Sequence, residues 1–172
     1  MKKKKEAIGW TIAILAVFIS LYLDNVFIEN ISLIRNSVLD WVFLLITFVS
    51  SEVILLLILT ALFLWRDNKR RWILPVWLSI GVSALVSFIL KLAIQRPRPY
   101  QTGIISLLPS LSEASHDLWN FSFPSSHAML AFCAIPILSE QYPKLKKVWI
   151  AFAVLIAFSR IYFGLHFVSD II

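Results

Sequence analysis

The residues best suited to chemistry lie near the end of the chain, where Ser159 and Arg160 are followed after five residues by His166 and after three more by Asp170. On a helix, residues four apart lie on one face. The Asp170 carboxylate is then expected to fix the tautomer of the His166 imidazole and to support its positive form. The Arg160 guanidinium is a planar donor suited to an oxyanion such as phosphate. Each residue alone is an ordinary polar group at a helix end, but the three together require a functional explanation.

A second basic string begins at Lys91 and continues, after six residues, with Arg98 and Pro99. Pro97 and Pro99 are expected to end a helix and to fix the backbone from which Arg98 is aimed. Arg96 is expected to be the solvated arginine of the pair. The simpler interpretation is that Lys91 extends to the membrane interface and that the Arg-Pro repeat only ends a helix.

The third string is Pro124-Ser125-Ser126-His127, directly before the apolar run 128–138. A proline followed by serines is a good helix start, and the free backbone N–H groups of a helix N-terminus favour an anion. Ser125 is also a candidate for a simple N-cap. His127 would stand in the first turn, where it is placed to donate a proton to a leaving group.

The elements that must position these strings are membrane helices. The 172 residues are 59% hydrophobic and 15% charged, with a mean hydropathy of +0.83, which is too apolar for an ordinary soluble domain. We therefore expect a single integral-membrane domain over residues 1–172 with an all-α, polytopic helical bundle, a six-helix core. Five apolar stretches approach the ~17–25 residues of a spanning helix: 8–23, 41–65, 72–93, 121–138 and 148–163. A sixth is expected to begin at Phe167 and to be truncated at Ile172.

The basic residues predict the orientation in the membrane. Eleven of the 16 lysines and arginines fall in Lys2–Lys5, residues 66–71 and residues 144–147. These segments share one side if the N-terminus is cytoplasmic, as the positive-inside rule expects. The net charge of +6 is thus a topology signal, and nucleic acid is not an expected partner. The histidines and their neighbouring cations are expected at the outer, extracytoplasmic face of the cell membrane.

Two further segments are expected at this outer face. Residues 24–40 have apolar side chains at helical spacing between polar neighbours, which is typical of an interfacial piece, and we assign this segment no chemistry. The loop 103–120 is long enough to cover a site. His116 within the loop is expected to be a surface histidine.

Two other functions are compatible with parts of this pattern. A metal centre would use the histidines and Asp170, but no ligand motif such as His-Glu-x-x-His is present and the flanking cations would repel a divalent ion; we expect no metal and no cofactor. A lipid transporter or scaffold would keep ionisable residues near the bilayer midplane, whereas here they gather at one face. Glu52 is the exception: it either lines a lipid-accessible cavity or only hydrogen-bonds Ser50 or Ser51.

In their order, the three strings closely resemble the signature of the type 2 phosphatidic acid phosphatase superfamily. That signature is Lys, six residues, Arg-Pro; then Pro-Ser-Gly-His; then Ser-Arg, five residues, His, three residues, Asp. The first and third strings match without a change of spacing, and the resemblance covers about residues 91–170. The second string has Ser126 in place of glycine, which keeps the backbone N–H but adds a Cβ and a hydroxyl near the expected phosphate.

The resemblance implies a metal-independent phosphatase, a hydrolase acting on a membrane lipid phosphate or diphosphate. It makes His166 the nucleophile that forms a phosphohistidine, Asp170 its orienting group and His127 the acid for the leaving oxygen. The phosphoryl oxygens would be held by Lys91, Arg98, Arg160, Ser125 and Ser126. An isoprenyl diphosphate of the undecaprenyl type is the favoured substrate, with phosphatidate and phosphatidylglycerol phosphate as alternatives. The sequence does not predict the oligomeric state.

Overall fold

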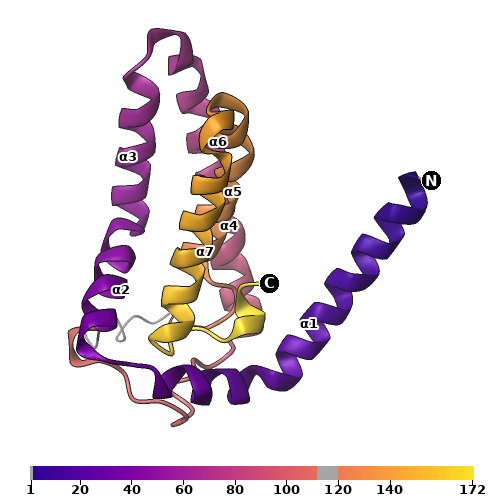
Figure 1. Ribbon diagram of the computed structural model, residues 1–172, viewed down its shortest axis with the longest axis vertical. Helices are drawn as coiled ribbons and strands as arrows, with labels where there is room; N and C mark the ends of the chain where they lie inside the picture. The colour runs from indigo at the N-terminus through magenta and orange to yellow at the C-terminus, as the bar shows by residue number, and fades with distance from the viewer. Residues whose placement is uncertain (1, 112–119) are drawn as a thin grey trace.

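The computed structural model describes residues 2–111 and 120–172, and His116 therefore lies outside the described residues. The described residues form helices and no strand, which confirms the all-α class (Figure 1). In chain order the elements are α1 (Lys2–Leu33), α2 (Ser37–Val49), α3 (Glu52–Leu64), η1 (Asp67–Trp72), α4 (Ile73–Ile94), η2 (Pro109–Leu111), α5 (Ser126–Cys133), α6 (Ile135–Gln141), η4 (Pro143–Leu145), α7 (Lys146–Tyr162) and η5 (Val168–Asp170). The symbol η marks a 3-10 turn.

Membrane-spanning character is strongest in the first half of the chain. Ile8–Leu33 and Asp67–Ile94 are long and apolar enough to cross a membrane, and α2 with α3 would make a third crossing if the bent pair is one span. The expected spans at 121–138 and 148–163 correspond to the shorter helices α5, α6 and α7. The protein is therefore a helical membrane protein with several broken or short helices.

The expected single span over 41–65 is broken in the middle. Helix α2 ends at Val49 and α3 begins at Glu52, with a bend of 66° between them. Ser50 closes α2 by donating its backbone N–H to the Ile46 carbonyl oxygen at 2.9 Å, and Ser51 takes an extended ψ of 146°. The break places Glu52 at the start of a new helix within the apolar segment.

The core lies between α3, α4, α5 and α6. Leu59 and Phe63 of α3 pack with Val76 of α4, Leu130 of α5 and Leu138 of α6 in one buried cluster. A second cluster lies at the other end of the molecule, and its buried members are Phe43, Tyr162, Phe163 and Leu165. Because the second cluster surrounds the end of α7, it fixes the chain directly before His166.

Helix α1 is set apart from the other helices and diverges from them toward its N-terminus (Figure 1). It continues to Leu33, so the expected end near residue 23 is wrong; the interfacial position of residues 24–40 stays a prediction. Its buried side chains among those described are Ser20, Asp24 and Ile28. These are four residues apart and form one stripe on the helix, so α1 contacts the rest of the protein along a narrow line.

Val168–Asp170 form the 3-10 turn η5, where the sequence predicts the start of a sixth helix. The Asp170 carboxylate accepts the backbone N–H of Phe167 at 2.7 Å, and the Asp170 N–H reaches the Phe167 carbonyl oxygen at 3.2 Å. A carboxylate on the third residue after an N-cap residue forms half of a capping box when it accepts the backbone N–H of that N-cap residue. The turn therefore has the hydrogen bonding of a helix N-terminus.

Candidate active site

A cavity of about 700 Å³ brings together the three strings that the sequence analysis singled out. Six of the eight predicted site residues line it: Lys91, Arg98, Ser126, His127, Arg160 and His166. The lining continues over Thr47, Phe48, Ser51, Glu52, Ala84, Phe88, Tyr100, Leu111, Asn120 and Leu165. Ser125 and Asp170 are buried outside this described lining. Glu52 is part of the cavity wall, and access of lipid to it stays a prediction.

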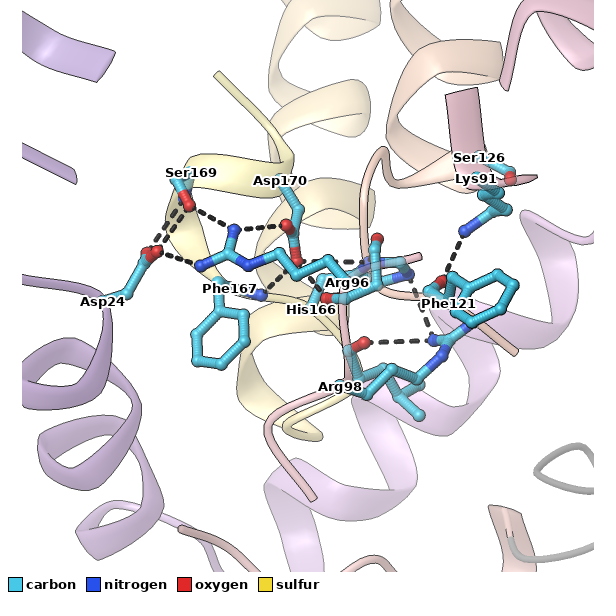
Figure 2. A network of polar contacts seen from close by, with 12 residues as sticks. Asp24, Lys91, Arg96, Arg98, Phe121, Ser126, His166, Phe167, Ser169 and Asp170 are labelled. Carbon is cyan, nitrogen blue, oxygen red and sulfur yellow. Dashed lines mark hydrogen bonds and ion pairs between the residues drawn. The ribbon is translucent and has the colours of Figure 1, made fainter. Parts of the chain in front are cut away.

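His166 is held in one tautomer. Its Nδ1 lies 2.6 Å from the carbonyl oxygen of Ser122, and a carbonyl oxygen only accepts, so Nδ1 carries the proton. Its Nε2 lies 3.3 Å from Nη1 of Arg98, and a guanidinium only donates, so Nε2 presents its lone pair. The ring is 2% exposed. The unprotonated nitrogen of the buried imidazole thus faces the Arg98 guanidinium (Figure 2), and both residues line the cavity.

The pKa of His166 is well below its ordinary value of 6.5. Burial of the ring is the largest cause, and the positive charges of Arg98, Arg160 and Lys91 add to it. All of these disfavour the imidazolium. His166 therefore stays neutral, and available as a nucleophile, at pH values where a free imidazole is protonated.

Asp170 supports His166 indirectly. Its Oδ2 lies 3.7 Å from Nδ1 of His166, which is an ion-pair distance but too long for a hydrogen bond. The same oxygen accepts the hydroxyl of Ser122 and the backbone N–H of Phe167. The sequence predicts a helical pair in direct contact, but Gly164 ends the helix earlier, with a φ of +67°. The carboxylate consequently fixes the peptide groups on both sides of the imidazole.

Three cations point toward the cavity from different elements. Lys91 Nζ on α4 donates to the Phe121 carbonyl oxygen at 2.7 Å. Arg98 Nη1 also donates to the Leu165 carbonyl oxygen at 3.0 Å. Arg160 on α7 reaches the Thr47 hydroxyl at 3.4 Å, and its buried Nε has no hydrogen-bond partner among the described residues. Such a set is suited to the oxygens of a phosphoryl group.

The sequence before Arg98 explains its position. Helix α4 ends at Ile94, and Gln95 takes the left-handed conformation with a φ of 51° while its N–H bonds the Lys91 carbonyl oxygen at 2.9 Å. A left-handed residue is a common helix C-cap, and proline after it prevents continuation. The prolines expected to end this helix therefore follow its end by a few residues.

The start of α5 supplies Ser126 and His127. Ser125 has the N-cap position, but its side chain makes no capping hydrogen bond, and its buried hydroxyl has no partner among the described residues. The Ser125 N–H donates to the Asp170 carbonyl oxygen at 3.0 Å. The Ser126 hydroxyl lies 2.8 Å from that of Ser87 on α4. The serine that replaces the expected glycine is thus accommodated by a second serine.

Four polar residues of the site were missed by the sequence analysis: Asp24, Arg96, Ser122 and Ser169. Arg96 is not the solvated arginine that we expected, because it binds Asp24 and Asp170 at 2.7 Å each. Asp24 and Ser169 meet although they are 145 positions apart. The only signal for Asp24 was an acidic residue at the end of an apolar run. Neither serine stands out from the sequence.

The donor set does not favour a metal ion. No group of three or more His, Cys, Asp or Glu side chains that could hold one occurs within residues 2–111 and 120–172. The histidines face arginine and lysine instead, which repel divalent ions. Metal-independent chemistry at this site remains a prediction.

The fold and the site define a class: a helical membrane protein whose buried imidazole and three cations face one cavity. A model of the PAP2 superfamily matches residues 72–172. The chain therefore belongs to the PAP2 superfamily.

Individual relatives support this assignment. The chain is 36% identical over 106 residues to phosphatidylglycerophosphatase B of Bacillus subtilis (strain 168), a match that covers 55% of this chain and 47% of the relative. It is 25% identical over 139 residues to undecaprenyl-diphosphatase BcrC of the same organism, covering 80% of this chain and 68% of the relative. The chain thus spans about half the length of the first of these relatives.

A solved structure has a similar fold. The crystal structure of a transmembrane PAP2-type phosphatidylglycerolphosphate phosphatase from Bacillus subtilis superposes with a TM-score of 0.70 at 26% identity. The match covers 95% of this chain and 86% of that chain. The likeness therefore extends beyond residues 72–172 to the N-terminal helices.

Proposed function

We propose that this protein is a membrane lipid phosphate phosphohydrolase that works through a phosphohistidine at the outer face of the cell membrane. One observation carries the proposal: Nε2 of His166 is unprotonated and faces a cavity that also exposes Lys91, Arg98 and Arg160. A nucleophile surrounded by fixed cations is the arrangement that phosphoryl transfer needs, because the transition state spreads charge over the phosphoryl oxygens.

The first chemical step follows from this geometry. His127 must enter this step as the imidazolium, with its proton taken up together with the anionic substrate. Nε2 of His166 attacks phosphorus, the bond from phosphorus to the leaving oxygen breaks, and His127 gives that oxygen its proton and becomes neutral. The three cations hold the remaining oxygens. The phosphorylated imidazole keeps its Nδ1 proton on the Ser122 carbonyl, with the Asp170 carboxylate 3.7 Å away as a counter-charge.

The second step regenerates the protein. His127, now neutral, takes a proton from a water molecule, the water oxygen forms a bond to phosphorus, and the bond from Nε2 to phosphorus breaks. Inorganic phosphate leaves and His166 returns to its starting tautomer. No metal or cofactor enters the balance.

For the substrate we propose an isoprenyl diphosphate of the undecaprenyl type, with phosphatidylglycerol phosphate or phosphatidate as the alternative. The relationship to an undecaprenyl-diphosphatase over 80% of the chain favours the first, and the relationship to phosphatidylglycerophosphatase B favours the second. In either case the apolar walls of the cavity, which include Phe48, Ala84 and Phe88, suit the start of a lipid tail.

The test is phosphate release by the purified full chain from a panel of these three lipid phosphates. His166→Ala is expected to abolish release, whereas His116→Ala serves as a matched histidine control. Denaturation in alkali during turnover of labelled substrate should leave the label on His166, and excess chelator should leave the rate unchanged. Full activity of His166→Ala, or label on another residue, would contradict the proposed nucleophile.

A further inference from the structure

Asp24 is a carboxylate buried within an apolar helix. It lies in the candidate span Ile8–Leu33 and is 2% exposed. A charge in such a position is costly unless it is paired and hydrogen-bonded. Its two oxygens accept from Nη2 of Arg96 at 2.7 Å, from the N–H of Ser169 at 3.1 Å and from the Ser169 hydroxyl. The carboxylate therefore joins α1 to the turn η5.

Arg96 lies between two carboxylates (Figure 2). Its Nη2 faces Asp24, and its Nη1 lies 2.7 Å from Oδ1 of Asp170 and 2.7 Å from the Ser169 hydroxyl. Its guanidinium carbon lies 4.2 Å from the centre of the Phe167 ring. The arginine is thus fixed on two sides by charge and on a third by an aromatic face.

This network ends at the imidazole. The Arg96 carbonyl oxygen accepts the N–H of Ser122 at 2.7 Å, and the Ser122 carbonyl accepts Nδ1 of His166. Through its side chain Arg96 holds Asp170, whose other oxygen accepts the Ser122 hydroxyl. Arg96 therefore restrains the Ser122 peptide from both directions, and that peptide selects the tautomer of His166.

We propose that Asp24 and Arg96 are positioning residues for His166, so that helix α1 takes part in setting the geometry of the nucleophile. The inference rests on the proposed function where activity is its readout. The described lining of the cavity includes neither residue, so both act through Asp170 and Ser122 and neither touches substrate.

The kinetic test uses Arg96→Met, Asp24→Asn and the double variant in the purified full chain. Arg96→Met is expected to lower kcat by roughly 10–100-fold, because small displacements of a reacting group have effects of that order. KM should change little, since no substrate contact is removed. Asp24→Asn alone should lower kcat less. The double variant should be faster than Arg96→Met, because it no longer contains a buried, unpaired Asp24 carboxylate.

Matched controls are available close by. Ser20→Ala removes a buried polar side chain one turn before Asp24 on the same stripe of α1; the Ser20 hydroxyl donates to the Val17 carbonyl oxygen within its own helix. Arg35→Met removes an arginine that binds the Ser106 carbonyl oxygen. Both controls should keep the wild-type kcat.

A second readout needs no turnover. Diethylpyrocarbonate labels neutral imidazoles. His127 lines the same cavity and serves as the internal reference. The ratio of labelling at His166 to labelling at His127 therefore measures how firmly the His166 ring is held. The ratio should rise in Arg96→Met and stay at the wild-type value in Arg35→Met. An unchanged ratio together with an unchanged kcat in folded Arg96→Met would overturn the inference. If the wild-type protein hydrolyses none of the lipid phosphates, the proposed function fails and the labelling ratio still decides this inference.

Discussion

At the scale of single residues, the central feature is an imidazole whose two nitrogens have different partners. A carbonyl oxygen at 2.6 Å fixes the proton on Nδ1, and a guanidinium at 3.3 Å requires the lone pair on Nε2. In many histidine sites a carboxylate accepts the Nδ1 proton directly. In this protein the Ser122 carbonyl oxygen accepts the hydrogen bond from Nδ1–H, while Asp170 accepts the Ser122 hydroxyl and places its negative charge 3.7 Å from Nδ1.

The depressed pKa of His166 predicts an unusual response to acid. The rate of diethylpyrocarbonate labelling at His166 should fall to half its maximum at a pH well below 6.5, the ordinary value. Arg98→Gln should move this midpoint upward, because it removes the nearest positive charge acting on the ring. A midpoint at or above 6.5 in the wild-type protein would contradict the burial and charge that the structure gives this residue.

The same shift affects stability. The unfolded chain takes up a proton on this histidine near pH 6.5, whereas the folded protein takes it up only at lower pH. Stability from this group is therefore fully present above pH 6.5 and is lost as the pH falls through the range between the two values.

At the scale of elements, the turn after α7 determines where His166 lies. Gly164 has a φ of +67°, and a Cβ built on it would lie 2.3 Å from Cγ2 of Ile105. Gly164→Ala should therefore both strain the backbone and push the turn away from Ile105. Gly103 has a similar φ of +79° with nothing within 4 Å of a built Cβ, so Gly103→Ala is a matched control for the backbone strain alone.

We expect Gly103→Ala to lower stability by about 1 kcal/mol with kcat unchanged. Gly164→Ala should lower kcat as well, by roughly 10-fold or more, because the following residues include His166, the proposed nucleophile. Ile105→Ala in the Gly164→Ala background should restore part of the rate, as measured by phosphate release normalised to folded protein. Equal kcat values for Gly164→Ala and Gly103→Ala would show that Ile105 does not transmit the displacement.

Local pattern was enough to predict some elements. The all-α class follows from the long apolar runs, and the end of α4 follows from the prolines after Gln95. The break after Val49 was not predicted, because Ser50 and Ser51 are also compatible with a continuous helix. The full length of α1 was missed because Asp24 looks like the end of a membrane segment until its partner Arg96 is known.

The site residues also divide into those that belong to a local sequence pattern and those that do not. The six cavity-lining residues that the sequence predicts belong to short strings with regular spacing. The role of Ser122 could not be predicted, because it is the backbone carbonyl that orients the His166 ring, and every residue has a backbone carbonyl. Arg96 was misjudged because its two carboxylate partners are 72 and 74 positions away, a separation that no local pattern reveals.

At the scale of the whole molecule, two of the three basic segments, residues 66–71 and 144–147, lie at the end of the helices opposite the site (Figure 1). Lys69 of η1 donates to the Gln141 carbonyl oxygen at the end of α6, and its Nζ lies 3.7 Å from the centre of the Tyr142 ring. Two of the three basic segments are therefore neighbours. In Figure 1 they lie at the end of the helices remote from the C-terminus, where the site is.

This arrangement predicts which loops a reagent reaches from outside the cell. In a Cys133→Ser background, Gln101→Cys should react with a membrane-impermeant maleimide in intact cells, because residue 101 is exposed near the site. Asn68→Cys, exposed in η1, should react only after the membrane is permeabilised. The opposite pattern would place the site on the cytoplasmic side, against the positive-inside rule.

The link between Asp24 and Ser169 also affects the order in which parts of the site can form during biosynthesis. Helix α1 leaves the ribosome first, but the two groups are 145 positions apart, so the Asp24 carboxylate cannot contact η5 until that intervening chain has been synthesised. Contacts between distant parts of a chain form only after the loop between them has been closed. Under the positioning role proposed for Asp24, the geometry of His166 is complete only when η5 docks on α1.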